Sequence, residues 1–527
     1  MKGRRNSTER MDISGECSGE NIGSGNQIVS LDQAESRHAK ELLDNKSKSN
    51  AALRPKELKV KTKRHKAKFQ ELLNIWEKAT ESMTVLNGII GVCFEKEFLI
   101  GSGSYGSEVY ICLGSDGIDR AIKRLPRLQC DQFGQNEKKI LTSPEATDSP
   151  RIVNYWFYDE KSSRDFCYLI LNLYEYNLEE HIREKGASMT EFQCQKIIRQ
   201  MMEGLEALHT RKPGIVHRDL KPTNILVKFG GDIALSDFGI GRIFQEGATT
   251  YNNTNPSGTR GWVANECVDW ERLYSNELQG HPPASLRWKE KSDIQVAGMI
   301  AFFVATKGKH PFGAPIDRLK NLHDDNPACL DELANEVLKD LLSQMLANDL
   351  DIRPYVEQVL MHPYFLSLQE QMSFLQNVGN EPEIRNFNGD PSCFVSNELD
   401  NRSQVSPRSS LIPNNWKEAI DGNDFNILCT GGYTRPSEYD GERYTHCLRL
   451  IRNVFQHPDG KLDQLNNNGQ QATSLEQYFS RVFPHLPLVV YQIIRKHQTW
   501  KERSAFSALF PVINRREAPV ENNDSQG

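Results

Sequence analysis

The stretch His217-Arg-Asp-Leu-Lys-Pro-Thr-Asn224 decides the fold of this chain. Within eight residues it places a carboxylate, a lysine and an amide at the spacing of a catalytic loop, where they serve as a base, a phosphate-binding cation and a metal ligand. Asp237-Phe-Gly239 follows eighteen residues after Asp219 and supplies a second metal ligand. An ordinary structural role requires neither element, so together they predict a site for phosphoryl transfer.

A glycine-rich turn upstream predicts where the phosphates lie. Gly101-Ser-Gly103-Ser-Tyr-Gly106-Ser-Glu-Val109 occupies a predicted strand-turn-strand, where backbone amides can approach phosphates only if side chains are absent. Alone, such a triplet is more often an ordinary turn. Here Ala121-Ile-Lys123 follows on a later predicted strand, and its lysine can neutralise the α- and β-phosphates. Glu137, on the next predicted helix, can hold that lysine in place.

These elements resemble the eukaryotic protein kinases over residues 94–365. Further landmarks of that family follow in order: Gly258-Thr259, Glu266, Asp293 and Arg353. The resemblance implies a bilobal α+β fold that binds ATP or ADP, with Mg²⁺ at the kinase site only. It implies that Asp219 accepts the proton of the substrate hydroxyl and that Lys221 steadies the transferring phosphoryl group. Asn224 and Asp237 would hold Mg²⁺, and Lys221 marks the serine/threonine form.

The same resemblance places an adenine-binding hinge at Asn172-Leu-Tyr174, after the apolar run 168–171. Arg218 beside Asp219 indicates control by phosphorylation of the activation segment, since a phosphate there would give the arginine a charge-assisted partner. The candidate acceptors are the hydroxyl residues Thr249, Thr250, Thr254 and Ser257. Asn265 stands where a proline is usual in Ala-Pro-Glu, so we expect substrate docking to be affected more than nucleotide binding.

Beyond Phe365 the chain continues without a break into residues 366–378, which implies a domain fused to the kinase. Residues 380–412 have the composition of a long loop, and the pattern is then helical to about Pro511. A helix is predicted over residues 445–455. Its apolar face carries Cys447, Leu448, Ile451, Val454 and Phe455, and its opposite face carries Arg449, Arg452, Asn453 and Gln456.

A polar cluster at the end of this predicted helix has the groups that phosphodiester cleavage needs. Asn453 and His457 are four residues apart and project from the same side, with Arg452 adjacent. An imidazole can protonate the leaving oxygen, while a cation and an amide stabilise the charged phosphorane. Taken alone, a histidine before Pro458 is more often a capping or surface residue.

The surrounding motifs make the interpretation specific. They are, in order, Asn415-Trp-Lys-Glu-Ala-Ile420, Tyr439-Asp-Gly441, Arg452-Asn453 with His457, and residues 478–486. Together they resemble, over residues 366–511, the all-α kinase-extension nuclease domain. That domain follows a kinase directly in the inositol-requiring-enzyme kinase/endoribonucleases of the unfolded protein response and in ribonuclease L.

This second resemblance implies roles for individual residues. Tyr439 and His457 would be the base and acid pair, while Arg452 and Asn453 would bind and orient the scissile phosphate. RNA cleavage would need no metal: the 2′-hydroxyl attacks and leaves a 2′,3′-cyclic phosphate and a 5′-hydroxyl. No cluster of carboxylates accompanies these residues in the sequence, as a two-metal nuclease would require. His485 and Arg481 are expected to be structural or dimer-forming.

Composition limits what the chain as a whole can do. Of its 527 residues 38% are hydrophobic and 25% are charged, which is typical of a globular protein. The net charge of −6 argues against affinity for nucleic acid or acidic lipid along the whole chain. The 11 cysteines are scattered without a CxxC, which favours neither a disulfide framework nor a zinc site and indicates a reducing compartment. No apolar stretch is long enough to cross a membrane.

The ends of the chain are predicted to be poorly structured. Residues 1–90 are expected to form a disordered, basic N-terminal region and residues 512–527 a polar tail. Residues 51–70 carry eight Lys/Arg against one acid, a local charge of +7. This segment is interpreted as a solvated linker, an RNA contact or a nuclear-import signal. A short amphipathic helix is predicted next, with Phe69, Leu72, Leu73 and Trp76 on one side.

The complete kinase site favours the inositol-requiring-enzyme branch over ribonuclease L, although the sequence contains no lumenal sensor, membrane span or ankyrin repeat. Either the chain is a paralogue with another input, which the polar N-terminus favours, or the gene model is truncated upstream. We expect a cytoplasmic protein. The alternatives are the cytosolic face of the endoplasmic reticulum, if the chain is tethered or truncated, and the nucleus.

The primary hypothesis is therefore a dual serine/threonine kinase and metal-independent endoribonuclease. Nucleotide and autophosphorylation would favour a homodimer or higher oligomer that cleaves RNA hairpin loops, and the only protein substrate could be the chain itself. The rival is a signalling kinase or nucleotide-sensing scaffold whose C-terminal module only dimerises. A third hypothesis is RNA binding through residues 51–70 without cleavage. The presence of Tyr439, Arg452, Asn453 and His457 together favours the nuclease.

Overall fold

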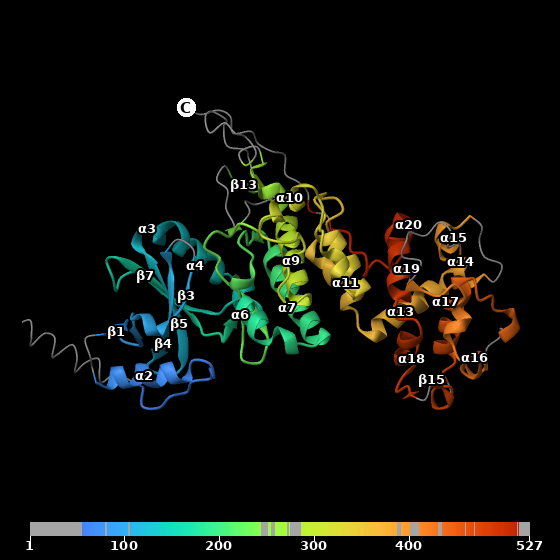
Figure 1. The fold of residues 1–527 in the computed structure, drawn as a ribbon, viewed down its shortest axis with the longest axis horizontal. Coiled ribbons are helices and arrows are strands. Elements are labelled where there is room, and N and C mark those ends of the chain that lie inside the picture. The colour runs from blue at the N-terminus through green and yellow to red at the C-terminus, as the bar shows by residue number, and fades with distance from the viewer. Residues whose placement is uncertain are drawn as a thin grey trace, which may run out of the picture.

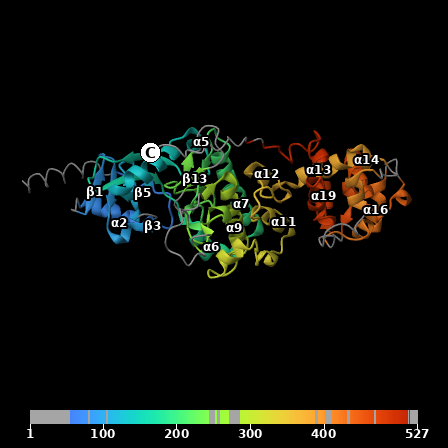
Figure 2. The ribbon, with the colours of Figure 1, turned by 90° about the horizontal axis from the view of Figure 1, so that it is seen from above.

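The computed structural model arranges the chain as three bodies in a row, two lobes and a separate helical domain (Figure 1). It describes residues 55–78, 82–103, 106–243, 251–253, 259–270, 273, 286–386, 392–400, 411–430, 435–458, 460–467, 470–513 and 515. Seen from above, the helical domain lies at the end of the molecule away from the N-terminal lobe (Figure 2). The predicted bilobal α+β fold followed by a helical domain is confirmed.

The N-terminal lobe is built on an antiparallel sheet of seven strands among the described residues. The strands are β1 (Met83–Leu86), β2 (Ile90–Cys93), β3 (Leu99–Ser102), β4 (Glu108–Gly114), β5 (Asp119–Pro126), β6 (Tyr155–Asp159) and β7 (Phe166–Asn172). Their order is β1-β2-β4-β5-β7-β6, and β3 pairs with β4. Helix α4 (Gln135–Leu141) follows β5 and carries Glu137. The glycine-rich segment thus joins β3 to β4, and Lys123 lies on β5, opposite Val109 in the register.

Helix α2 (Lys66–Glu77) packs against this sheet, and it corrects the prediction that residues 1–90 are disordered. Phe69, Leu72 and Trp76 are fully buried on one face of the helix, as its periodicity predicted. Trp76 lies directly over Gly91 of β2, where a Cβ atom would clash with the indole ring. The described residues 55–78 and 82–90 are therefore ordered, because three apolar side chains at helical spacing bury enough surface to offset the entropy of ordering. Residues 1–54 lie outside the described part of the chain.

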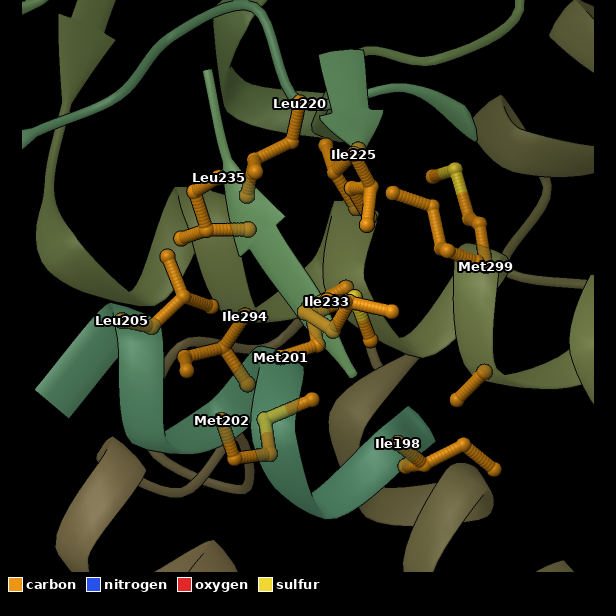
Figure 3. Close-up of a cluster of buried hydrophobic side chains, with 14 of the residues drawn as sticks. Ile198, Met201, Met202, Leu205, Leu220, Ile225, Ile233, Leu235, Ile294 and Met299 are labelled. Carbon is orange, nitrogen blue, oxygen red and sulfur yellow. The ribbon is translucent and has the colours of Figure 1, made fainter. Parts of the chain in front are cut away.

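The C-terminal lobe is mainly helical and holds a dense apolar core. Its longer helices are α6 (Leu178–Lys185), α7 (Glu191–His209), α9 (Glu290–Ala305), α10 (Arg318–His323), α11 (Glu336–Met345) and α12 (Val356–Leu360). Short strands β10 (Ile225–Val227) and β11 (Ile233–Leu235) pair antiparallel over α7. Figure 3 shows Met201 and Leu205 of α7 facing Ile233 and Leu235, with Ile294 of α9 beside them. This core supports the loop between residues 217 and 224 from below.

The C-terminal domain has its own core and is formed almost entirely by helices. They are α13 (Leu368–Asn380), α14 (Pro382–Arg385), α15 (Phe394–Asp400), α16 (Gly422–Cys429), α17 (Tyr444–Gln456), α18 (Leu475–Val482), α19 (Leu486–Arg495) and α20 (Gln498–Lys501). The prediction of a long loop over 380–412 was wrong at α14 and α15. Val395 and Leu399 of α15 are buried, so this segment closes the core of the domain.

The junction between the lobe and the helical domain is built around one buried carboxylate. Asp340 of α11 accepts hydrogen bonds from His362 (3.0 Å), Gln492 (2.7 Å) and Arg495 (2.9 and 3.3 Å). Gln492 and Arg495 belong to α19 of the C-terminal domain. Burial alone would raise the pKa of Asp340. The hydrogen bonds and charges of His362 and Arg495 outweigh burial and hold this pKa well below its usual value. The two parts therefore pack against each other as a fused unit, as the unbroken sequence predicted.

Two further observations concern the cysteines and the membrane. Cys130 and Cys167 form a disulfide in the structure, a pairing that the sequence analysis did not predict. It links the segment after β5 to β7, two elements of one lobe.

Among the helices that the structure describes, none combines the length and the apolar character needed to span a bilayer.

Candidate active sites

The predicted nucleotide site contains a buried lysine between two carboxylates. Lys123 Nζ lies 2.7 Å from Glu137 Oε2 and 2.8 Å from Asp237 Oδ1. Glu137 comes from α4 and Asp237 from the segment after β11, so three separate elements of sequence meet here. The pairing of Lys123 with Glu137 that the sequence suggested is present.

Burial and pairing act in opposite directions on this cluster. Burial alone would lower the pKa of Lys123, but Asp237 and Glu137 outweigh it and raise the pKa. Burial disfavours ionisation of Asp237, yet Lys123 dominates and its pKa lies below the usual value. Burial raises the pKa of Glu137 against the attraction of Lys123. The lysine therefore stays charged, as phosphate binding requires.

A cavity of about 820 Å³ opens beside this cluster, between the two lobes. Most predicted nucleotide-binding residues line it: Gly101, Gly103, Val109, Ala121, Lys123, Glu137, Asn172 and Tyr174. Leu226 lines it from the C-terminal lobe. Gly106 has a φ of 73°, the left-handed conformation that favours glycine, although it is not among the lining residues. The cavity has the size of a small-molecule site and offers apolar walls to a flat base and a cation to phosphates.

The catalytic loop forms a closed set of polar contacts around Asp219. Lys221 Nζ lies 2.7 Å from Asp219 Oδ2 and donates to Thr259 Oγ1 at 2.8 Å. Thr259 in turn donates to Asp219 Oδ1 at 2.8 Å. Asn224 Nδ2 donates to the carbonyl (2.8 Å) and the carboxylate (3.1 Å) of Asp219. Asp219, Lys221 and Asn224 thus meet at one place, and Asp237 lines the same cavity as Lys221 and Asn224. Thr259 is a member that sequence reasoning noted only as a landmark.

The backbone of this loop is held in an unusual conformation by Asp293 of α9. Arg218 and Asp237 both have left-handed φ values, 68° and 63°, which are costly for residues other than glycine. Asp293 accepts from the backbone N–H groups of His217 (2.8 Å) and Arg218 (3.1 Å), and from His209 (2.9 Å). This buried carboxylate therefore fixes the direction in which Asp219 points.

The residues present fit the magnesium ion that the kinase resemblance implies. Asn224 and Asp237 line the same cavity, and Asp237 is ionised because its pKa is low. Mg²⁺ typically takes one or two protein oxygens together with oxygens of the substrate phosphates. Asn224 and Asp237 offer the protein oxygens, and the neighbouring Lys123 offers a cation to the phosphates. When bound, the ion would neutralise charge on the phosphates being transferred.

Two asparagines that sequence reasoning did not assign to the site have clear structural roles. Asn136 Nδ2 lies within hydrogen-bond distance of three backbone carbonyls, those of Phe238 (2.9 Å), Gly239 (3.1 Å) and Gly241 (2.8 Å). It ties α4 to the segment that carries Asp237. Asn265 donates its backbone N–H to Gln295 Oε1 at 2.8 Å, a bond that the usual proline could not make. The departure from Ala-Pro-Glu is thus matched by a buried glutamine on α9.

The second candidate site lies on the C-terminal domain, where Tyr439 meets the end of α17. Asn453 Nδ2 lies 3.1 Å from the Tyr439 hydroxyl, and Arg452 donates to Asn453 Oδ1 at 2.8 Å. His457 follows directly after α17, and its backbone N–H donates to the carbonyl of Asn453. The structure therefore brings Tyr439, Arg452 and Asn453 into one chain of contacts and places His457 one turn farther along the helix.

The loop that carries Tyr439 is fixed by the Asn415–Ile420 motif. Trp416 Nε1 donates to the carbonyls of Asp440 (3.0 Å) and Arg443 (2.9 Å), and Lys417 donates to the carbonyl of Tyr439. A Cβ atom at Gly441 would meet the side-chain amide of Asn415, so any larger residue would have to displace that amide. The Asn415–Ile420 motif therefore has a structural role, which is to orient the loop that carries Tyr439.

Helix α13 contributes a residue that no sequence motif indicated. Asn380 Oδ1 accepts from Arg452 Nε at 2.9 Å and lies 3.5 Å from Gln456 Nε2. Partial burial, and then nearby Arg385, lowers the pKa of Arg452, while Tyr439 opposes the shift. Two guanidinium groups, those of Arg452 and Arg385, thus lie near each other beside the contact chain to Tyr439, an arrangement that suits an anionic phosphate.

One detail of the predicted helix differs from the expectation. Arg449 was placed on its polar face, but the side chain is buried and donates to the carbonyls of Ile384 and Arg385. Helix α14 covers this side of α17, so Arg449 orients the segment that carries Arg385. The apolar face was predicted correctly, since Cys447, Leu448 and Ile451 are fully buried.

Some predicted residues fall outside the described part of the chain. They are the candidate phosphoacceptors Thr249, Thr250, Thr254 and Ser257, together with Gly258. Within the described residues, no cluster of three or more His, Cys, Asp or Glu side chains could hold a metal ion.

Comparisons with known proteins agree with the two sites. Residues 94–365 match the family model described as protein kinase domain, and residues 371–510 match the one described as ribonuclease 2-5A. The chain is 28% identical over 452 residues to the human serine/threonine-protein kinase/endoribonuclease IRE2, covering 83% of this chain and 44% of that protein. It is 28% identical over 437 residues to rice serine/threonine-protein kinase/endoribonuclease IRE1, covering 78% and 44%.

A fission-yeast relative named sensor for unfolded proteins in the ER ire1 is 27% identical over 421 residues, which cover 75% of this chain and 37% of that protein. The chain therefore spans less than half the length of these relatives. What is similar is the part that carries both candidate sites.

Proposed function

We propose, from the premise that the chain belongs to the protein kinase family, that it is a dual serine/threonine kinase and endoribonuclease. Its kinase domain is followed by a ribonuclease 2-5A domain, an order shared with relatives whose names join kinase and endoribonuclease. The observation that carries the nuclease half is the contact chain Tyr439–Asn453–Arg452 at the end of α17. A module that served only to dimerise would have no need of it.

In the proposed cleavage, the arrangement performs acid-base chemistry on a ribose phosphate. The 2′-hydroxyl attacks the adjacent phosphorus while its proton passes to one member of the Tyr439 and His457 pair. The bond from phosphorus to the 5′-oxygen breaks, and the other member donates a proton to that oxygen. Arg452 and Asn453 stabilise the extra negative charge on the phosphorane. The products are a 2′,3′-cyclic phosphate and a 5′-hydroxyl, and no step requires a metal.

We further propose that nucleotide binding and autophosphorylation favour a homodimer or higher oligomer that assembles the complete RNA surface. His457 is exposed at the end of α17, so one domain offers few contacts to a large substrate. RNA hairpin loops are the proposed substrate because their unstacked bases can be splayed against a protein surface. By analogy with the named relatives, the activity belongs to a response like that to unfolded proteins, and the proposed location is the cytoplasm.

The test is cleavage of an end-labelled hairpin RNA by the purified full chain in EDTA, after phosphorylation with Mg²⁺-ATP or without it. We expect His457→Ala to lower cleavage by at least ~10²-fold, with a 2′,3′-cyclic phosphate on the wild-type product. His323→Ala, which removes an exposed histidine of the kinase domain, serves as the matched control and should cleave normally. Absence of cleavage by protein that is dimeric and phosphorylated would contradict the nuclease and favour the scaffold.

A further inference from the structure

Residues 59–65, which we call the strap, run from the N-terminal lobe to the hinge ahead of α2. At one end the backbone N–H groups of Lys61 (3.2 Å) and Thr62 (3.0 Å) donate to the carboxylate of Asp119, the first residue of β5. Lys59 donates to the carbonyl of Gly117 at 2.8 Å. A Cβ atom at Gly117 would clash with the carbonyl of Glu57, so the chain approaches this turn closely. The strap is therefore anchored on the N-terminal lobe.

At the other end the strap is bound by Glu175, the residue after the hinge residue Tyr174. This carboxylate is 6% exposed and accepts from Thr62 Oγ1 (3.2 Å) and from the N–H groups of Lys63 (2.9 Å) and Arg64 (3.0 Å). The Arg64 guanidinium donates to the Glu175 carbonyl at 3.1 Å and pairs with Glu180 of α6 at 3.1 Å. The carboxylate of Glu175 is thus held by three donors of the strap, two of them backbone N–H groups.

The strap also forms part of the wall of the nucleotide cavity. Arg64 and His65 of the strap line the cavity together with Tyr174 and Glu175, and Lys68 of α2 lies on the same wall. This is the hinge side of the cavity, whereas Lys123 and Asp237 mark the side where phosphates would bind. Asp119 and Lys123 lie on the same strand, so the strap connects the strand that bears the phosphate-binding lysine to the hinge.

We propose that the strap is a clasp that retains nucleotide by joining the two lobes on the hinge side of the cavity. If the lobes separate, Asp119 moves away from Glu175, and the strap can stay bound to only one of these two carboxylates. The strap then loses at least two charge-assisted hydrogen bonds, either those to Asp119 or those to Glu175. This loss makes lobe opening less favourable and so slows nucleotide release. The inference rests on the proposal that this cavity binds ATP or ADP, and it gives a role to part of the basic segment 51–70.

The experiment measures dissociation of a fluorescent ADP analogue, mant-ADP, from the full chain by stopped flow with excess unlabelled ADP. Glu175→Ala removes the acceptor of the strap and should raise the dissociation rate roughly tenfold. Arg64→Ala removes an exposed ion pair and one backbone contact and should raise it by about threefold. Lys61→Ala is the matched control: it removes the same charge from the strap but leaves the backbone bond to Asp119, so the rate should not change.

Hydrogen exchange over α2 provides a second readout. Glu175→Ala should speed exchange in residues 66–77, since the strap then no longer fixes the start of the helix. If Glu175→Ala fails to fold, Arg64→Ala and Thr62→Val carry the test, because Thr62→Val keeps the shape and loses the hydroxyl. Unchanged dissociation rates in folded variants would overturn the clasp. A wild-type chain that binds no mant-ADP would instead overturn the proposed nucleotide site.

Discussion

The two candidate sites of this chain differ in how their residues are held. In the kinase site, Lys123, Glu137 and Asp219 are buried, and each is fixed by partners from other elements. In the nuclease site, Arg452 and Asn453 lie half-buried on one helix and His457 is exposed, while only Tyr439 is fully enclosed. A small nucleotide needs a closed pocket, whereas an RNA needs an open face. Under the proposed function, the first site would be complete in one chain, and the second would be completed by its RNA substrate or by a second copy.

The largest effect that would test this contrast comes from Asp237→Asn. The change removes the charge that pairs with Lys123 and the carboxylate of the metal pair, so we expect autophosphorylation to fall roughly 10³-fold. Incorporation of labelled phosphate measures the effect, and circular dichroism checks that the fold is kept. A loss of less than about tenfold would show that the buried cluster is not the phosphoryl-transfer site.

On the open site, Asn453→Ala should lower RNA cleavage by about 10²-fold, because it removes the amide that bridges Arg452 and the Tyr439 hydroxyl. Tyr439→Phe should cost a similar factor, and the double variant should be no worse than tenfold below either single one. Gln456→Ala, an exposed neighbour on the same helix, is the control. Full additivity of the two substitutions would mean that the contact chain does not act as a unit.

The junction between the two sites gives a test on stability and pH. Asp340→Asn leaves Arg495 without its counter-charge, so we expect a loss of about 3 kcal/mol in the free energy of unfolding at pH 7. Because the folded pKa of Asp340 lies below the unfolded value of ~3.9, the unfolded state binds the proton first as the pH falls. The contribution is complete above that value and is lost below it.

Burial also lowers the pKa of His362, which adds a loss of stability in the same direction below about pH 6.5. Urea unfolding between pH 7 and pH 2 measures both contributions, that of His362 below about pH 6.5 and that of Asp340 below ~3.9. The wild type should lose stability over this range, and the gap between it and Asp340→Asn should narrow at the acid end. A gap that widens toward acid pH would contradict the assignment of the charge to Asp340.

The smallest effect concerns the kinase lobe alone. Asn265→Pro restores the usual residue but removes the backbone N–H group that donates to Gln295 Oε1. We therefore expect a loss of about 1 kcal/mol in the free energy of unfolding. ADP affinity should stay within about twofold, since the nucleotide cavity is formed by other residues. Thermal unfolding and ADP titration measure the two quantities. An increase in stability would mean that Gln295 finds another donor.

Sequence reasoning predicted best the residues whose chemistry is constrained by fixed spacing. The loop at 217–224 and Asp237 had to be matched in both type and distance, and the structure gathers Lys221 and Asn224 around Asp219 and places Asp237 on the same cavity. It failed for residues whose role arises from contact with distant parts of the chain. Asn136, Asn380 and Glu175 belong to no short motif, and their partners are from about 70 to more than 100 residues away.

The ordered segment 55–78 is a second case in which local sequence does not reveal the contacts that a segment makes with distant residues. Its positive charge suggested a disordered linker, which was wrong for this segment, and its apolar residues suggested a helix, which α2 confirms. Its docking depends on Gly91, Asp119 and Glu175, which leave space and acceptors for it on the surface of the lobe. No local pattern in residues 55–78 reveals these partners.

By itself, the sequence determined the class of chemistry: a catalytic loop with its metal ligands, a phosphate-binding lysine, and a cluster suited to cleaving a phosphodiester. These follow from residue type and short spacing, because each helix turn and tight loop sets the distance between neighbours along the chain. Only the tertiary structure decided how the sites are held and closed. The network of Asp340, the bond from Asn380 to Arg452 and the strap on Glu175 each join surfaces that meet only after the chain has packed.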